Sequence, residues 1–117
     1  MHALIIEDES LIAMAIEDAL RDCGYLTFDF ADSTPTAIAA AESHCPDLVT
    51  SDVQLSPGCG IEAVAAICLD KVIPVIFITG TAALVEERLG THIVVHKPFV
   101  SEHISSAVPR AVYKSLN

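Results

Sequence analysis

Positive charge is scarce in this sequence. Only 6 Lys and Arg stand against 16 Asp and Glu among 117 residues, which gives a formal net charge of -10. Proteins that bind nucleic acids or anionic lipids need clustered cations to meet the phosphates. The composition therefore argues against nucleic acid or a membrane surface as a direct partner. We interpret most of the negative charge as a solvated acidic surface.

Cysteines at metal-binding or redox spacing are also lacking. The chain has no C-x-x-C pair and no paired histidines beside a cysteine, so nothing in the spacing predicts a zinc site or a disulfide framework. We expect the cysteines to be small buried thiols in a reducing compartment. They are Cys23, Cys45, Cys59 and Cys68.

The histidines do not predict a metal site either. His92 and His96 are four residues apart, but they fall in a predicted strand and not in a helix, so they do not form a metal-binding face. The remaining three are isolated in the sequence, and we expect them to face solvent. They are His2, His44 and His103.

Long apolar runs, repeats and linkers are absent as well. The longest apolar run is far shorter than the roughly 20 residues of a membrane-spanning helix, and acids by residue 7 argue against a signal peptide. Hydrophobic residues nevertheless make up 52% of the chain, enough for a full core. We expect one cytoplasmic domain that covers residues 1–117.

Short apolar runs alternate with helical patterns along the whole chain. Strands are expected at 3–6, 25–30, 48–51, 73–78 and 93–95. Helical patterns follow at 10–23, 34–45, 61–68, 82–89 and 101–112, the fourth short and the last expected to be kinked or interrupted by Pro109. Such alternation predicts an α/β fold, in which helices cover both faces of a parallel sheet through right-handed crossovers.

The strands end in polar side chains of complementary chemistry. Asp52 directly follows the third strand, and Glu7 and Asp8 follow the first. Thr79 follows the fourth strand, and Lys97 follows the fifth. Because the carboxyl ends of parallel strands meet at one edge of the sheet, we expect these side chains to share a pocket.

Together these groups suit a phosphoryl group on a carboxylate. Three neighbouring carboxylates repel one another unless a cation joins them, and oxygen ligands suit Mg²⁺. Aspartate is a known nucleophile for phosphoryl transfer, and a hydroxyl and an ammonium can hold the remaining phosphoryl oxygens. Taken singly, the acids are more simply explained as solvated loop residues, and Lys97 as their salt-bridge partner.

Four motifs in register resemble the receiver domain of bacterial two-component response regulators. They are Ile6-Glu7-Asp8-Glu9, Ser51-Asp52, Ile78-Thr79-Gly80 and Lys97-Pro98-Phe99. The resemblance covers nearly the whole chain. It implies a flavodoxin-like, doubly wound sheet of five parallel strands in the order 2-1-3-4-5, built from five strand–helix units.

The resemblance also implies a role for each residue. Asp52 would accept a phosphoryl group from a histidine kinase or a phosphotransfer protein, and Thr79 and Lys97 would bind the phosphoryl oxygens. Asp8 would bind Mg²⁺ directly, and Glu7 would do so through water. The Lys97-Pro98 bond would be cis. The full magnesium set would be Glu7, Asp8, Asp52 and the backbone carbonyl of Gln54.

The chain departs from the family pattern where receivers change conformation. Val94 occupies the position of the usual aromatic switch residue, and the short interval from Thr79 to Lys97 implies a short or mobile fourth helix. The run Phe77-Ile78-Thr79-Gly80 resembles a subgroup named for a Phe-Ala-Thr-Gly motif, typical of alphaproteobacteria. In that case signalling would run through ordering of residues 80–90.

The resemblance implies a phosphorylation-controlled binding module and not an enzyme. It would act as a stand-alone receiver that binds a downstream protein through its fourth helix, fifth strand and fifth helix. Alternatives are a receiver cut from a larger regulator or hybrid kinase, or a phosphate sink. A phosphatase of the haloacid dehalogenase type is less favoured because Gln54 stands where its general acid would be, and a flavin carrier because the acids 7–9 repel phosphate.

Overall fold

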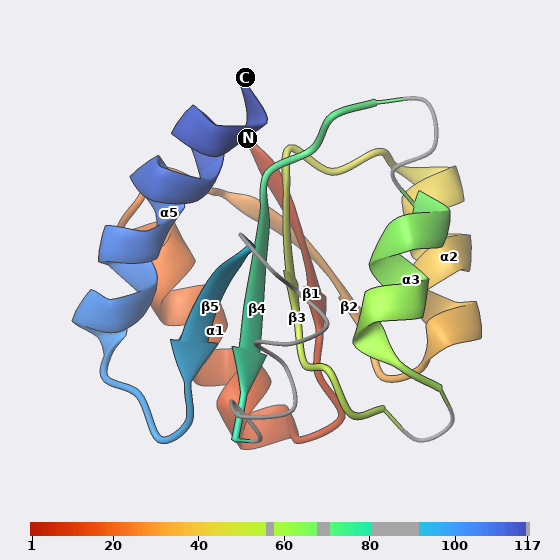
Figure 1. Cartoon of the computed structure of the whole chain (residues 1–117), viewed down its shortest axis with the longest axis horizontal. Helices are drawn as coiled ribbons and strands as arrows, with labels where there is room; N and C mark the ends of the chain where they lie inside the picture. The colour runs from red at the N-terminus through yellow and green to blue at the C-terminus, as the bar shows by residue number, and fades with distance from the viewer. Residues whose placement is uncertain (56–57, 68–70, 81–91, 117) are drawn as a thin grey trace.

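The computed structural model describes residues 1–55, 58–67, 71–80 and 92–116. They contain one parallel sheet of five strands in the order β2-β1-β3-β4-β5 (Figure 1). The strands are β1 (His2–Ile6), β2 (Thr27–Ala31), β3 (Leu48–Ser51), β4 (Val75–Thr79) and β5 (Ile93–His96). The predicted flavodoxin-like fold and its strand order are confirmed.

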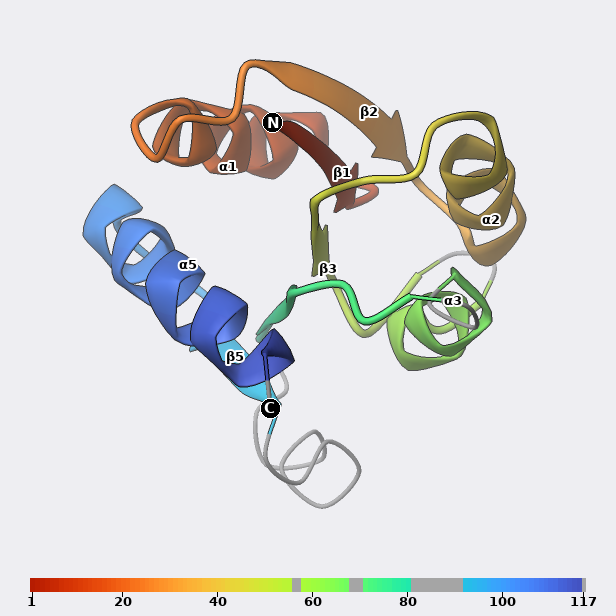
Figure 2. The ribbon, with the colours of Figure 1, turned by 90° about the horizontal axis from the view of Figure 1, so that it is seen from above.

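Helices cover both faces of this sheet. The described residues include α1 (Ser10–Arg21), α2 (Thr34–Ser43), α3 (Gly60–Ile67) and α5 (Ser101–Ser115). Seen from above, α1 and α5 lie on one side of the strands and α2 and α3 on the other (Figure 2). The short fourth helix expected at 82–89 lies outside the described residues, as does nearly all of the 80–90 segment. None of the helices in the described ranges has the length and apolarity that a bilayer crossing requires.

Two cores follow from the alternation of side chains along each strand. In β1, Ala3 and Ile5 pack with α1 and α5, whereas Leu4 and Ile6 pack with α2 and α3. All five residues of β1 are buried, as expected for a central strand with helices on both faces. The sheet is therefore a rigid support for the residues at the two ends of its strands.

The predicted interruption at Pro109 does not occur, because α5 runs through it without a break. A proline inside a helix leaves the carbonyl four residues earlier without its usual donor. Here that carbonyl belongs to Ser105, and the Cys23 thiol of the neighbouring chain segment lies 4.0 Å from it as a weak donor. The tertiary contact thus offsets part of the cost of the proline.

Several local predictions need correction. The side-chain cap of α2 is Ser33, whose hydroxyl accepts the Thr36 N–H at 3.3 Å. Cys45 is exposed, and the other two described cysteines, at positions 23 and 59, are only half-buried; no disulfide joins any two of these three. Cys68 lies outside the described residues.

His2 is the clearest correction. It was expected to face solvent, yet it is only 5% exposed and bonds to two side chains of β2. Nor is His44 isolated, because its ring stacks on that of His2 with centroids 3.7 Å apart, although it is exposed. His103 is exposed as expected, and its ring accepts the Val100 N–H at the start of α5.

Candidate functional site

Strand register brings the predicted polar residues to one edge of the sheet. Ile6 of β1 pairs with Ser51 of β3, so the residues that follow each of them leave the sheet side by side. Thr79 of β4 pairs in the same way with His96 of β5, directly before Lys97. The backbone continues these pairings, because the Asp52 N–H bonds to the Ile6 carbonyl at 2.9 Å and the Lys97 N–H to the Thr79 carbonyl at 2.9 Å.

Lys97 joins the acids of two strands. Its ammonium Nζ donates to Glu7 Oε1 at 2.8 Å and to Asp52 Oδ2 at 3.0 Å. The Glu7 side chain is fully buried, and those of Asp52 and Lys97 are 11% and 17% exposed. A cation thus lies between two nearly enclosed carboxylates, where charge interactions are stronger than at an open surface.

Burial and hydrogen bonding shift the pKa values of Glu7 and Lys97 in opposite directions. Burial raises the pKa of Glu7, although hydrogen bonds from Lys97 and from the Glu9 N–H offset part of that rise. Burial would lower the pKa of Lys97, but its bonds to Glu7 and Asp52 outweigh this, and the pKa is raised. Lys97 is therefore firmly cationic at neutral pH, and its charge favours the ionised form of Glu7.

The acids also meet the requirements of a small divalent cation. Glu7, Asp8 and Asp52 each offer an oxygen, and these atoms lie within 4.8 Å of one another. Asp8 is exposed, so a cation can approach from solvent. A set of carboxylate oxygens open to water matches what Mg²⁺ takes in proteins.

Thr79 and Gln54 complete the predicted set. The Thr79 side chain is 1% exposed at the end of β4, next to the strand that delivers Lys97. The Gln54 N–H donates to Asp52 Oδ1 at 3.3 Å, so the loop after the acid folds back onto the carboxylate. The edge therefore brings together all six residues that the sequence singled out.

Two further residues fix the path of the chain around Asp52. The Ser51 hydroxyl donates to the Asp52 carbonyl at 2.9 Å. Gly60, the first residue of α3, packs so closely that a Cβ on it would lie 1.8 Å from the same carbonyl oxygen. From the sequence, Ser51 was noted only as part of the Ser51-Asp52 motif, and Gly60 was not noted. The signal available for Gly60 was that a glycine opens a helix directly after the acceptor loop.

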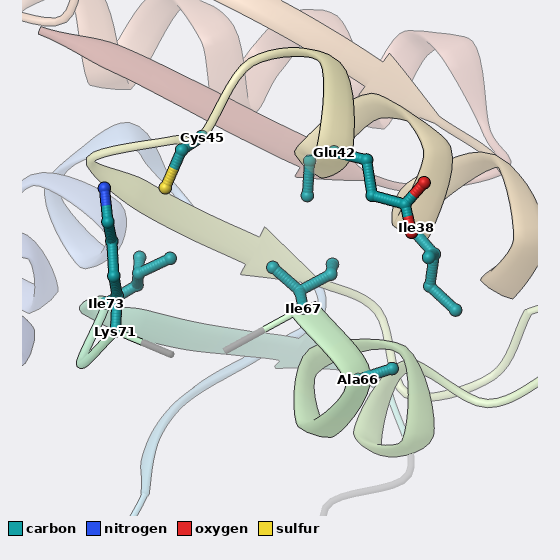
Figure 3. Close-up of a pocket in the computed structure, with 8 residues that line it drawn as sticks. Ile38, Glu42, Cys45, Ala66, Ile67, Lys71 and Ile73 are labelled. Atoms are coloured by element: carbon teal, nitrogen blue, oxygen red, sulfur yellow. The ribbon is translucent and has the colours of Figure 1, made fainter. Parts of the chain in front are cut away.

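Two hollows lie near these elements. One, of about 410 Å³, borders the acids and is flanked by the exposed side chains of Met14 and Phe30. Another, of about 310 Å³, lies away from the acids beside α2 and α3 (Figure 3). Apolar side chains line most of the second one, together with Glu42, Cys45 and Lys71. Of these two hollows, the first adjoins the candidate site.

Comparison with known proteins gives a consistent result. A family model described as "Response regulator receiver domain" matches residues 3–109. The phyllosphere-induced regulator PhyR of Methylorubrum extorquens is 35% identical over 114 residues, covering 94% of this chain and 43% of that protein. The regulator PdtaR of Mycobacterium tuberculosis is 34% identical over 115 residues, covering 95% and 56%. The chain thus spans about half the length of these relatives.

A solved structure extends the likeness to three dimensions. The PhyR receiver domain of Erythrobacter litoralis, determined in solution, superposes with a TM-score of 0.86 at 33% identity. The match covers 96% of this chain and 89% of that one. The shared fold is therefore accompanied by a level of identity that coincidental likeness between α/β sheets does not give.

Proposed function

Because this chain belongs to the response regulator receiver family, we propose that it is a signalling switch controlled by phosphorylation of Asp52. It would work by binding a protein in one phosphorylation state and not as an enzyme in its own right. The observation that supports Asp52 most strongly is the Lys97 ammonium bound to it and to Glu7 at a buried strand edge. A structural salt bridge alone would not need a third acid beside it, open to solvent.

The transfer follows from the groups present. A carboxylate oxygen of Asp52 attacks the phosphorus of a phosphohistidine on a kinase or phosphotransfer protein. An O–P bond forms, the N–P bond breaks, and its electron pair remains on the departing imidazole. The Lys97 ammonium can follow the charge from the carboxylate to the new phosphoryl oxygens. The Thr79 hydroxyl would donate to another of them.

Four groups would hold Mg²⁺ at this edge: Glu7, Asp8, Asp52 and the backbone carbonyl of Gln54. Bound there, the ion offsets negative charge on the acids and on the phosphoryl oxygens. Glu7 and Asp52 already share one cation, Lys97. A second positive charge would therefore reduce the repulsion among the acids. It would also reduce their repulsion of an incoming phosphoryl group.

Partners are proposed on two surfaces. The donor would dock beside the acids, where Leu11, Met14 and Phe30 are exposed. The downstream protein would bind β5, α5 and the fourth-helix segment, which lies outside the described residues. Val94 in β5 pairs with Phe77 and is half-buried, so we propose that this face responds without the usual rotation of an aromatic ring.

The relatives leave the wider setting open. PhyR of Bartonella quintana is described as an anti-anti-sigma factor, and the chain covers 49% of that protein. We propose three arrangements for this receiver. It acts alone, it is part of a larger regulator or hybrid kinase, or it serves as a phosphate sink. The same acceptor chemistry serves each of these arrangements.

Intact-mass measurement with acetyl phosphate and Mg²⁺ tests the acceptor. Wild type should gain one phosphoryl group, whereas Asp52→Asn and a sample containing EDTA should gain none. Asp22→Asn, at an exposed carboxylate that caps the C-terminal end of α1, should react like wild type. A phosphoryl group on Asp52→Asn, or a failure of the wild type to react with both acetyl phosphate and a phosphorylated phosphotransfer protein, would contradict the proposal.

A further inference from the structure

A second cluster of metal-binding side chains lies at the opposite edge of the sheet. It is made of His2 at the start of β1, Asp29 in β2 and His44, which ends α2. Each offers a nitrogen or oxygen ligand atom, and these atoms lie within 4.8 Å of one another. Five residue-to-residue steps of extended strand, roughly 16 Å, lead from His2 to Glu7. The cluster is therefore independent of the phosphorylation site.

His2 is held in the orientation that a metal ligand requires. Its Nδ1 lies 2.8 Å from Thr27 Oγ1 and its Nε2 lies 3.0 Å from Asp29 Oδ2. A ligating histidine usually donates its other ring N–H to an oxygen, which sets the tautomer and frees the second nitrogen for the ion. Because a carboxylate only accepts, the Nε2–H of His2 donates to Asp29 before an ion binds. An ion at Nε2 would displace this proton, and Nδ1–H would then donate to the Thr27 hydroxyl. The imidazole is also buried, so this orientation does not have to be selected from many rotamers.

His44 supplies the third ligand, and its ring can change orientation to bind the ion. Its ring stacks on that of His2 with an angle of 12° between the planes. Lone pairs of parallel rings do not converge on one point, so one ring has to tilt before both can bind one ion. His44 is exposed, and within the described part of the chain its ring makes no hydrogen bond. The adjustment can therefore occur at His44 while His2 stays in place.

We propose that His2, Asp29 and His44 form a binding site for Zn²⁺, with water as the fourth ligand. Two imidazoles and one carboxylate suit zinc in tetrahedral coordination, whereas Mg²⁺ prefers oxygen ligands alone. The net charge of -10 favours a cation at this edge too. The three ligands come from β1, β2 and the end of α2. The ion would therefore link β2, the outermost strand of the sheet, to its neighbour β1 and to α2.

Calorimetric titration of the untagged protein with Zn²⁺ tests the site. Saturating Mg²⁺ in the buffer occupies the acids at the other edge, and omission of a histidine tag removes competing imidazoles. Wild type should bind one equivalent of Zn²⁺, and the melting temperature should rise on binding. His44→Ala and Asp29→Asn should weaken binding at least about tenfold, and Thr27→Val about 10- to 100-fold.

Matched controls separate this site from other zinc ligands. Cys45→Ser removes the thiol next to His44, and His103→Ala removes an exposed imidazole elsewhere; both should bind Zn²⁺ like wild type. His44→Ala keeps the bonds of His2 to β2, so its circular dichroism should match that of wild type. The proposal is overturned if wild type fails to bind one equivalent, or if His44→Ala binds as tightly as wild type. Weaker binding by Cys45→Ser but not by His44→Ala would also overturn it.

Discussion

Replacing Lys97 by methionine removes the charge shared by two acids but keeps a side chain of similar length. Glu7 is then a fully buried carboxylate with Asp52 as a like-charged neighbour. Removing one partner of a buried ion pair costs about 3–5 kcal/mol. Because the Lys97 side chain is 17% exposed, we expect the lower end of this range, about 3 kcal/mol, at neutral pH. For a domain of this size that loss lowers the melting temperature by roughly 10 °C.

Glu7 decides how this loss depends on pH. Burial raises the pKa of Glu7 from its ordinary value of 4.5, and the bond from Lys97 lowers it, so the pKa should rise further in Lys97→Met. A group whose pKa is higher in the folded state stabilises the fold most below its unfolded pKa. That contribution disappears as the pH rises through the folded pKa. The deficit of Lys97→Met should therefore shrink as the pH falls from neutral toward 4.5.

Urea unfolding of four proteins tests this reasoning: wild type, Lys97→Met, Glu7→Gln and the double variant, each in EDTA at neutral and at mildly acidic pH. The double variant should recover most of the loss, because an amide at position 7 does not need a cation. Lys114→Met, at an exposed lysine of α5, should stay within about 0.5 kcal/mol of wild type. A double variant no more stable than Lys97→Met would refute the argument, as would a deficit that grows toward acidic pH.

Three further substitutions have defined outcomes in urea unfolding. Thr50→Val should stabilise the protein by about 1 kcal/mol, because the buried Thr50 hydroxyl has no hydrogen-bond partner among the described residues; a clear loss would contradict this. Gly60→Ala should cost about 1–3 kcal/mol and slow phosphorylation, because its Cβ would meet the Asp52 carbonyl. Gly80→Ala is a control for stability only, since its Cβ would make an ordinary contact of 3.9 Å with Cβ of Lys97. Ala66→Leu should stabilise by up to about 1 kcal/mol by filling the hollow beside α2 and α3, and no gain would argue that the hollow closes in solution.

The fold and the acidic edge were predictable because their signals are local and repeated. Each strand is an apolar run that ends in its own polar residue, and parallel strands end at one edge whatever their exact register. Thus Glu7, Asp52 and Lys97 could be grouped before any contact between them was known. The bounds of β2 were less certain, since its first expected residue, Tyr25, is buried outside the strand.

What could not be predicted depends on contacts between distant segments. His2 meets Thr27 only because the two residues are paired in the register of β1 and β2, and a lone histidine before a strand carries no sign of this. The interruption expected at Pro109 was wrong, since α5 continues through it. The Cys23 thiol that lies against the Ser105 carbonyl comes from 82 residues away in the sequence. Gly60 matters only because of the path that the chain takes around Asp52.

The strand β1 has His2 at one end and is followed by Glu7 at the other, with two different cores on its faces between them. Inserting or deleting one residue inside it would turn one end onto the wrong face and exchange the core side chains from that point on. Both edges of the sheet would then be altered by a single change in length. Homologous chains should therefore tolerate length variation in their loops but keep the count of residues in β1 constant.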